Sequence, residues 1–301
     1  MTLTQKIMRL QLTARSATLG LLLALGLLTG CMEYDAPLKE YRYHYPGDRP
    51  MVHGILSAND GLSVWLEMSH SPLDTLLDHK GIEGAQVELL ADGLPFLVLA
   101  QAEPGLYHSP TDVNFPLDKE YALRVTHPTL PVMLSEGQRI PPRVLIDSAK
   151  LEVMVAGSGS SSNFITIHLT DPGGMPIYYS YTYSYFFLGQ EYFNDGLLDP
   201  RVLFSNESIS GRSHSFTTHL YWINTPEGAN SSRPDSIRVY LYTLSHGLYQ
   251  FKQSLRHEGG EGFMPHHLPY VHTNIHNGLG VFGAISSDAK TLRLPQRTQT
   301  Q

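Results

Sequence analysis

Apolar and polar residues alternate over long stretches of this chain, and this two-residue period restricts it to folds built from strands. Val64 and Leu66 flank Trp65, and Leu123 and Val125 flank Arg124. Successive side chains of a strand point to opposite faces, so such segments place one apolar face on a core. Turn sequences separate the segments at intervals typical of a sandwich: Asn59–Gly61, Ala91–Gly93 and Pro104–Gly105. The pattern predicts an all-β domain over residues 50–140.

A proline pair divides the chain into two predicted domains. In the Ile140–Pro142 segment neither proline can donate a backbone hydrogen bond, and the residue before each is restricted to extended conformations. We place the domain boundary there. Beyond it, alternating residues in Leu151–Val155 and Ile165–Leu169 lie on either side of a Gly- and Ser-rich turn, which predicts a hairpin. The second domain, residues 143–297, is therefore also predicted to be mainly β.

One amphipathic helix is predicted in the second domain, over residues 245–258. Leu248, Phe251 and Leu255 recur at spacings of three and four residues, Ser245 is suited to the N-cap, and Gly259–Gly260 ends the pattern. Its apolar stripe should pack on a sheet. The predicted fold class is thus mainly β: two immunoglobulin-like, Greek-key β-sandwich domains in tandem, with one short amphipathic helix in the second.

The first thirty residues have the composition of a secretory signal peptide. Lys6, Arg9 and Arg15 are followed by an apolar run of 12 residues, Ala17–Leu28, with no acidic residue. The run is shorter than the about 20 residues that a membrane-spanning helix needs. Leu28–Cys31 resembles the lipobox of bacterial lipoproteins, in which the cysteine is lipidated and becomes the first residue of the mature chain. We therefore predict removal of residues 1–30 and anchoring through acyl chains on Cys31.

The mature chain is acidic and has no second cysteine. Residues 1–30 hold three of the 21 basic residues and none of the 28 acidic ones, so the net charge of the mature chain is −10. This charge argues against nucleic acid as a partner, because phosphate binding needs basic residues. Cys31 is the only cysteine, so no intramolecular disulfide can form. Residues 31–49, rich in tyrosine, proline and charge, are predicted to be a lipidated tether.

Several motifs together resemble the domain of unknown function 4249 family of Bacteroidetes outer-membrane lipoproteins. The motifs run over nearly the whole mature chain: Gly81–Val87, Pro104–Tyr107, Ile140–Ser148, Leu169–Gly173 and, most specific, Asn274–Ala284. The resemblance implies an outer-membrane lipoprotein exposed at the cell surface, with immunoglobulin-like domains, often encoded beside a TonB-dependent transporter. It implies no known reaction. Acidic residues after the lipidated cysteine favour surface export in that phylum, and Glu33 and Asp35 fit this loosely, so the periplasmic face stays an alternative.

Four histidines near the C-terminus raise the question of a metal. His266, His267, His272 and His276 fall within eleven residues, and imidazole is a common ligand of zinc and copper. The spacing is not that of a helical zinc motif, and prolines at 265 and 269 preclude a regular helix. We therefore assign no metal and no cofactor, and interpret these histidines as loop residues or as part of a ligand surface.

A tyrosine ladder is the second candidate for ligand binding. Tyr179, Tyr181, Tyr183 and Tyr185 alternate with serine and threonine. Their rings could form a sugar platform or the inward face of a strand, and the polar residues between them favour the inward face. The acidic turn at Asn194–Asp199 could bind calcium but lacks the ligand spacing of an EF-hand, so we interpret it as a turn.

No catalytic motif is visible in the sequence. The chain has no Gly-x-Ser-x-Gly elbow and no cysteine besides Cys31, whereas paired carboxylates for glycoside hydrolysis have no fixed spacing to search for. The leading hypothesis is a non-enzymatic, lipid-anchored accessory protein of the outer membrane. Its partner would be a TonB-dependent transporter or another barrel complex, and its role substrate capture or complex assembly. The alternative is a surface glycan-binding protein or hydrolase with its site at the domain junction.

Overall fold

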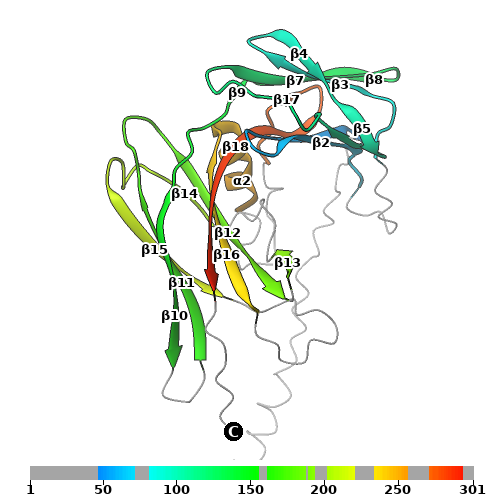
Figure 1. Ribbon diagram of the computed structural model, residues 1–301. Coiled ribbons are helices and arrows are strands. Elements are labelled where there is room, and N and C mark those ends of the chain that lie inside the picture. Colours follow the sequence, from blue (N-terminus) through cyan, green and yellow to red (C-terminus); the bar gives the residue numbers. More distant parts are fainter. Residues whose placement is uncertain are drawn as a thin grey trace, which may run out of the picture. The chain divides into compact units, whose positions relative to one another are not determined.

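The computed structural model describes residues 47–71, 81–155, 161–187, 189–193, 202–220, 234–256 and 271–293 (Figure 1). The predicted signal peptide, Cys31 and the tether up to residue 46 lie outside these ranges. The described part is mainly β, as predicted, with its strands in sheets of nine, three and six strands and one helix. Within it, no helix is long and apolar enough to cross a bilayer.

The first core lies between one end of the nine-stranded sheet and the six-stranded sheet. The nine-stranded sheet contributes β1 (Pro50–Ser57), β2 (Gly61–Met68), β5 (Ala100–Glu103) and β6 (Leu106–His108). The six-stranded sheet consists of β3 (Gln86–Ala91), β4 (Leu94–Val98), β7 (Glu120–His127), β8 (Leu130–Ser135), β9 (Gln138–Arg139) and β17 (Ile275–His276). The predicted alternation holds, since Val64, Leu66, Leu123 and Val125 are all buried in one cluster.

The second core lies between the other end of the nine-stranded sheet and the three-stranded sheet. The three-stranded sheet consists of β10 (Ile146–Val155), β11 (Ser161–Thr170) and β15 (Ser213–Leu220), with β10 and β11 paired as the predicted hairpin. Opposite lie β12 (Tyr178–Phe187), β13 (Gln190–Phe193), β14 (Leu203–Ser205), β16 (Ser236–Leu244) and β18 (Leu279–Arg293). Ile165 and Ile167 pack with Val239 and Leu241 in a cluster separate from the first.

One long strand, β18, belongs to both cores. It pairs in parallel with β1 and antiparallel with β16, and Figure 1 shows it (red) running from the first core into the second. Phe282 and Ala284 are buried in the first core, whereas Leu292 packs on the second. The segment 274–285, which the sequence placed in the second domain, therefore completes the first core. The two cores share a continuous sheet.

The C-terminal motif Asn274–Ala284 contains the turn before β18 and the first residues of this strand. The buried Asn274 amide holds the backbone of Phe282 from both sides: its Oδ1 accepts the Phe282 N–H at 2.9 Å and its Nδ2 donates to the Phe282 carbonyl at 2.8 Å. Asn277 and Gly280 both have positive φ, 60° and 99°. The turn between them brings β18 alongside β1, so these residue types are explained by backbone geometry.

Replacing Asn274 with alanine should destabilise the fold. Both backbone groups of Phe282 would lose their side-chain partners at a position where water does not reach, and leaving buried polar groups unpaired costs about 1–3 kcal/mol each. We expect a loss of roughly 2–3 kcal/mol in the free energy of unfolding, measured by urea denaturation. Asn277→Gly is the matched control. The exposed Asn277 amide donates to the Val132 carbonyl, so its loss should cost less free energy of unfolding. We call the two hydrogen bonds between the Asn274 amide and the Phe282 backbone the Asn274 clamp. Equal losses of stability in the two variants would contradict its role.

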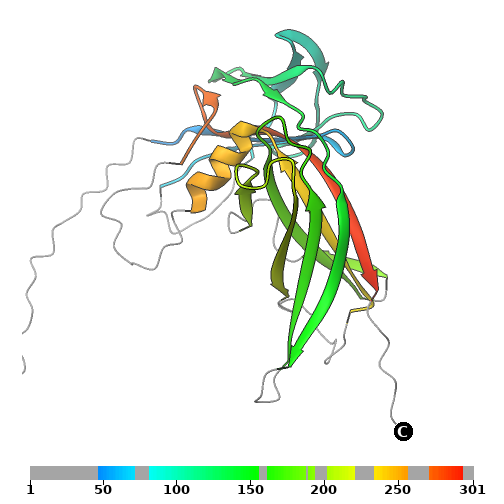
Figure 2. The same cartoon turned by 90° about the vertical axis from the view of Figure 1, so that its left-hand side faces the viewer.

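The helix α2 (His246–Arg256) falls within the predicted range and packs on β18 (Figure 2). Gly283 permits the close approach, because a Cβ at this position would lie 2.5 Å from the Leu248 Cβ. Ser245 stands at the N-cap position, since its carbonyl accepts the Tyr249 N–H, but its hydroxyl instead accepts the Ala284 N–H. The helix N-terminus is capped from a distance, by Gln138 Oε1 on the Gly247 N–H. The predicted Gly259–Gly260 end lies outside the described residues.

Candidate functional site

The tyrosine ladder faces the second core. Tyr179, Tyr183 and Tyr185 are buried, and the half-buried Tyr181 packs on Phe216 with 4.5 Å between ring centroids. A sugar platform needs an exposed ring face, so the burial favours the core-face interpretation. The opposite face of β12 is covered as well: Ser180 accepts a hydrogen bond from the buried Lys252 Nζ, and Ser184 donates to Glu191.

The candidate metal residues are only partly described. His266, His267 and the Asn194–Asp199 turn lie outside the described residues, as does Cys31. His276 is exposed on β17, whereas the His272 N–H donates to Ser254 Oγ and its Nε2 is buried without a hydrogen-bond partner among the described residues. In the described ranges, no three His, Cys, Asp or Glu side chains are grouped so as to hold a metal ion.

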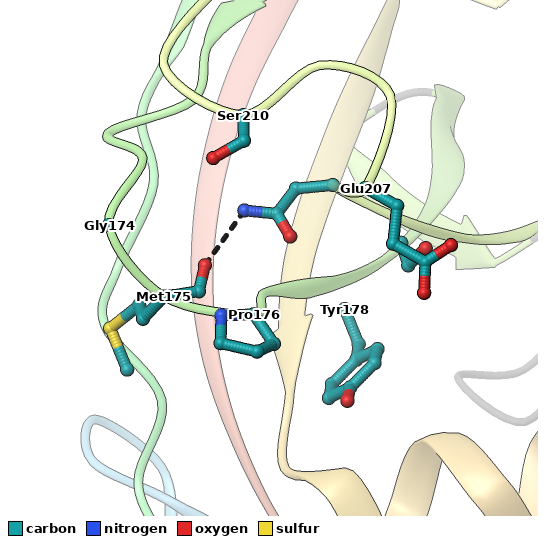
Figure 3. Close-up of a pocket in the computed structure, with 8 residues that line it drawn as sticks. Gly174, Met175, Pro176, Tyr178, Glu207 and Ser210 are labelled. Atoms are coloured by element: carbon teal, nitrogen blue, oxygen red, sulfur yellow. Dashed lines mark hydrogen bonds between the residues drawn. The ribbon is translucent and has the colours of Figure 1, made fainter.

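A groove of about 760 Å³ lies where the two cores meet, and we call it the junction groove. Its walls come from four separate segments of the chain. They are Leu117 and Glu120 beside β7; Glu136–Pro142; Met175–Tyr178; and Leu244–His246 at the start of α2. A smaller pocket of about 410 Å³ adjoins it, sharing Met175, Pro176 and Tyr178 and adding Glu207 and Ser210 (Figure 3).

The proline wall of the junction groove is fixed to both sheets. The Pro141 carbonyl accepts a hydrogen bond from Ser286 Oγ of β18 at 2.6 Å, and the Pro142 carbonyl accepts one from Thr243 Oγ1 of β16 at 2.8 Å. Because proline already restricts its own backbone, these two bonds leave the wall little freedom. The Ile140–Pro142 segment is therefore held in one conformation by β16 and by β18, the strand that both cores share.

Tyr178 forms the aromatic wall together with two residues of α2. Its ring stacks on Tyr249 with 4.2 Å between centroids and lies 5.4 Å from the His246 ring. Burial, and to a smaller extent the neighbouring Tyr249 and Glu207, raise the pKa of Tyr178 above its usual value. The phenol is therefore neutral at physiological pH and available as a hydrogen-bond donor.

The charged side chains around the groove are mainly acidic. Glu120 pairs with Arg139 at 3.8 Å, and Glu136 and Glu207 add two further carboxylates. Beside these charges, two large apolar side chains are exposed: Leu117 is 62% exposed and Met175 is 52% exposed. The groove thus combines a rigid proline wall, an aromatic wall, surplus negative charge and uncovered apolar surface.

A family sequence model described as "Domain of unknown function (DUF4249)" matches residues 33–291. The chain belongs to the DUF4249 family. This confirms the family resemblance that the motifs predicted. No curated protein matches the chain at a significant level.

The structure explains why the DUF4249 motifs occur together. In the first core, Tyr107 Oη accepts the Ala85 N–H at 3.1 Å and donates to the Ile82 carbonyl at 2.9 Å, which joins the Gly81–Val87 and Pro104–Tyr107 motifs. A Cβ on Gly81 would lie 2.3 Å from the Pro104 carbonyl oxygen. These two motifs are therefore one packing unit of the first core.

The Leu169–Gly173 motif of this DUF4249 chain positions the Met175 loop beside the groove. Asp171 is buried and accepts hydrogen bonds from the Tyr179 hydroxyl at 2.5 Å and from the Gly173 and Gly211 N–H groups. Asn206 donates to Asp171 and to the Met175 carbonyl, the second of which Figure 3 shows. Burial alone would raise the pKa of Asp171, but these hydrogen bonds hold it below its ordinary value.

The sequence drew attention to Pro141 and Pro142, which line the groove, but not to its other lining residues. The Pro141–Pro142 pair marked its place in the chain, whereas Leu117, Met175, Tyr178 and His246 had no motif of their own. Tyr178 directly precedes the predicted ladder and, because side chains alternate along a strand, falls on the opposite face of β12. That alternation is the one signal in the sequence that could have separated Tyr178 from the buried tyrosines.

Proposed function

We propose that this DUF4249 chain is a non-enzymatic, lipid-anchored accessory protein of the outer membrane. It is built on two immunoglobulin-like sandwiches and works beside a TonB-dependent transporter or another barrel complex, in substrate capture or complex assembly. The observation that carries the proposal is the junction groove, in which Leu117 and Met175 expose large apolar surfaces beside a fixed proline wall. Exposed apolar surface of this kind marks interaction sites.

The Leu28–Cys31 motif and the family membership support the location. A processed and lipidated Cys31 would tie the chain to a membrane, and residue 47, where the described fold begins, lies sixteen residues further on. An extended chain spans about 3.3 Å per residue, so a tether of this length allows a reach of at most roughly 50 Å. The groove would therefore stay near other proteins of the same membrane.

Affinity purification of the tagged, lipidated chain from its native outer membrane tests the proposed association. We expect one barrel protein in an amount comparable to the bait, retained through washes of moderate ionic strength. A chain that repeatedly comes without any barrel protein would contradict the proposal.

Replacing Cys31 with alanine should abolish anchoring. The acyl chains could not be attached, so we expect an unprocessed precursor or a protein lost from the membrane fraction, detected by fractionation and by labelling with a fatty-acid analogue. A serine variant at the same position should behave like the alanine variant, because it too lacks the thiol. Unchanged lipid labelling in either variant would refute the anchor.

Display on the cell surface makes a separate prediction. Protease added to intact cells should degrade the protein, and a periplasmic control protein in the same cells should survive. Protection of the chain in intact cells, with degradation after lysis, would place it on the periplasmic face.

The glycan-binding alternative is favoured by a different surface. Phe193 of β13 and Tyr240 and Tyr242 of β16 form a row of stacked rings, with centroids 5.7 Å and 6.1 Å apart, on the side of the sheet away from the second core. Glu191 beside them accepts hydrogen bonds from Ser184 and Tyr240 at 2.6 Å. Such rings can contact pyranose faces. A glycan array probed with the mature protein and with the Phe193→Ala variant tests this alternative, and binding that the variant loses would support it.

A further inference from the structure

We propose that the junction groove binds an extended polypeptide segment of the partner, one that carries apolar and basic side chains. This inference rests on the proposed function, because it takes the partner to be the barrel protein of the complex, and it adds which surface is used and what chemistry it recognises. The groove volume of about 760 Å³ is enough for several side chains of such a segment.

The apolar surface of the groove fits aliphatic side chains. Leu117 comes from the loop before β7, a strand of the first core, and Met175 from the loop before β12, a strand of the second core. The two exposed side chains therefore approach the groove from opposite sides of the junction. Pro141, Pro142 and Pro176 extend the apolar lining between them. Methionine is flexible and polarisable, and it recurs at surfaces that accept varied apolar side chains of peptides.

The aromatic wall favours a peptide over a sugar. Pyranose recognition by tyrosine needs an open ring face. The Tyr178 ring stacks on Tyr249 at 4.2 Å and lies 5.4 Å from the His246 ring, so α2 already covers part of the ring surface that a sugar could use. The hydroxyl of Tyr178 and the His246 ring at the exposed start of α2 can instead bond to the backbone of an extended segment.

The charges of the groove select a basic segment. Among the described residues, the carboxylates that line the groove and its adjoining pocket are Glu120, Glu136 and Glu207, and the one guanidinium in these linings, that of Arg139, pairs with Glu120 at 3.8 Å. Two carboxylates are left over around the groove, in a chain whose net charge is −7 before processing. Complementary charge raises association rates and excludes wrong partners, so a Lys or Arg beside the apolar anchors is the matching feature.

The groove is also pre-organised for binding. Hydrogen bonds from Ser286 and Thr243 fix the proline wall, and Gln138 Oε1 joins the floor to the first turn of α2 through the Gly247 N–H. A site that is ordered before the partner arrives loses little conformational freedom on binding. The partner segment alone then has to become ordered.

Site-specific photo-crosslinking in cells that make the full, lipidated chain tests this inference. A photoreactive phenylalanine derivative replaces Leu117 or Met175 in the groove and, as controls, Val98 on β4 or Val132 on β8. These controls are similarly exposed, at 55% and 49%, but lie on the six-stranded sheet outside the groove. A second set of cells carries the groove probes together with E120K/E136K. Thermal unfolding of every purified variant checks the fold, and these exposed positions should leave it unchanged.

We expect both groove probes to crosslink to one polypeptide, mapped by mass spectrometry to a segment that holds apolar residues and at least one Lys or Arg. The charge-reversed background should reduce that adduct at least about tenfold. Adducts from Val98 or Val132 alone, with the barrel protein still co-purifying, would overturn the groove and leave the accessory function standing. Adducts to glycan or lipid alone would overturn the proposal that the groove binds a polypeptide segment. Absence of both adducts and barrel partner would overturn the proposed function itself.

Discussion

Replacing Gly280 with alanine is expected to destabilise the protein strongly. Gly280 has φ +99°, and a Cβ there would lie 2.2 Å from the Val52 carbonyl oxygen of β1. The backbone conformation alone costs an L-residue about 1–2 kcal/mol. The overlap with a backbone atom cannot be relieved by a rotamer change, so β18 would have to move away from β1. We expect a loss of roughly 3 kcal/mol or more in the free energy of unfolding, measured by urea denaturation followed by circular dichroism.

Gly93→Ala is the matched control for this variant. Gly93 also has a positive φ, +79°, but a Cβ there would meet nothing within 4 Å. It should therefore show the cost of the backbone conformation alone, about 1–2 kcal/mol. The difference between the two variants measures the contact of β18 with β1. Similar losses from both would show that the parallel pairing tolerates a Cβ and that the two cores are less tightly joined than the structure indicates.

Replacing Asp171 with asparagine should give the second large effect. The amide keeps the shape but loses the charge, and with its oxygen on the Gly173 and Gly211 N–H groups its NH2 would face the Asn206 Nδ2 donor at the Oδ2 position. The 2.5 Å bond from the Tyr179 hydroxyl is charge-assisted, and such bonds contribute about 1.5–3 kcal/mol. We expect a loss of roughly 2–3 kcal/mol at neutral pH, with the Met175 loop loosened because Asn206 loses its acceptor.

The pH dependence of this variant follows from the lowered pKa of Asp171. A carboxyl whose pKa is lower in the folded protein stabilises it above the unfolded pKa, about 3.9, and this stabilisation is lost as the pH falls through the folded pKa. The difference in stability between the wild type and D171N should therefore be full at pH 7 and shrink below pH 4. Asp147→Asn, at an exposed carboxylate that accepts from Thr170, should change stability little at either pH. If the stability difference between the wild type and D171N did not change with pH, Asp171 would not be a buried charged group with a lowered pKa.

Much of the fold could be predicted because its signals are local. Alternation in residues 121–125 and 237–241 identified inward faces, and the spacing of Leu248, Phe251 and Leu255 identified α2. The division into successive domains did not anticipate β18, because nothing local tells a strand near residue 280 to pair with one near residue 52. The Asn274 clamp and Gly280 set that pairing, and their role is visible only when both strands are in place.

The candidate site was less predictable for the same reason. The junction groove is assembled from segments that lie up to 129 residues apart, at Leu117 and His246, and of these segments only the proline pair stood out in the sequence. The residues that did attract notice, the tyrosine ladder, are mostly buried, because aromatic alternation is typical of a core strand. Even the side-chain acceptor for the first turn of α2 is supplied by Gln138, more than 100 residues away. Sequence patterns report local structure and say little about which loops meet.

Quantitative affinity purification of the full lipidated chain from its native outer membrane, with wild type beside E120K/E136K, tests the groove as the partner's contact surface. We expect the wild type to bring down one barrel protein in about equal amount. Reversing the charge of two groove carboxylates, with the fold intact, should lower its recovery at least about tenfold. Equal recovery of the barrel protein with both baits would contradict the groove as the contact. Its absence from both would contradict the accessory function.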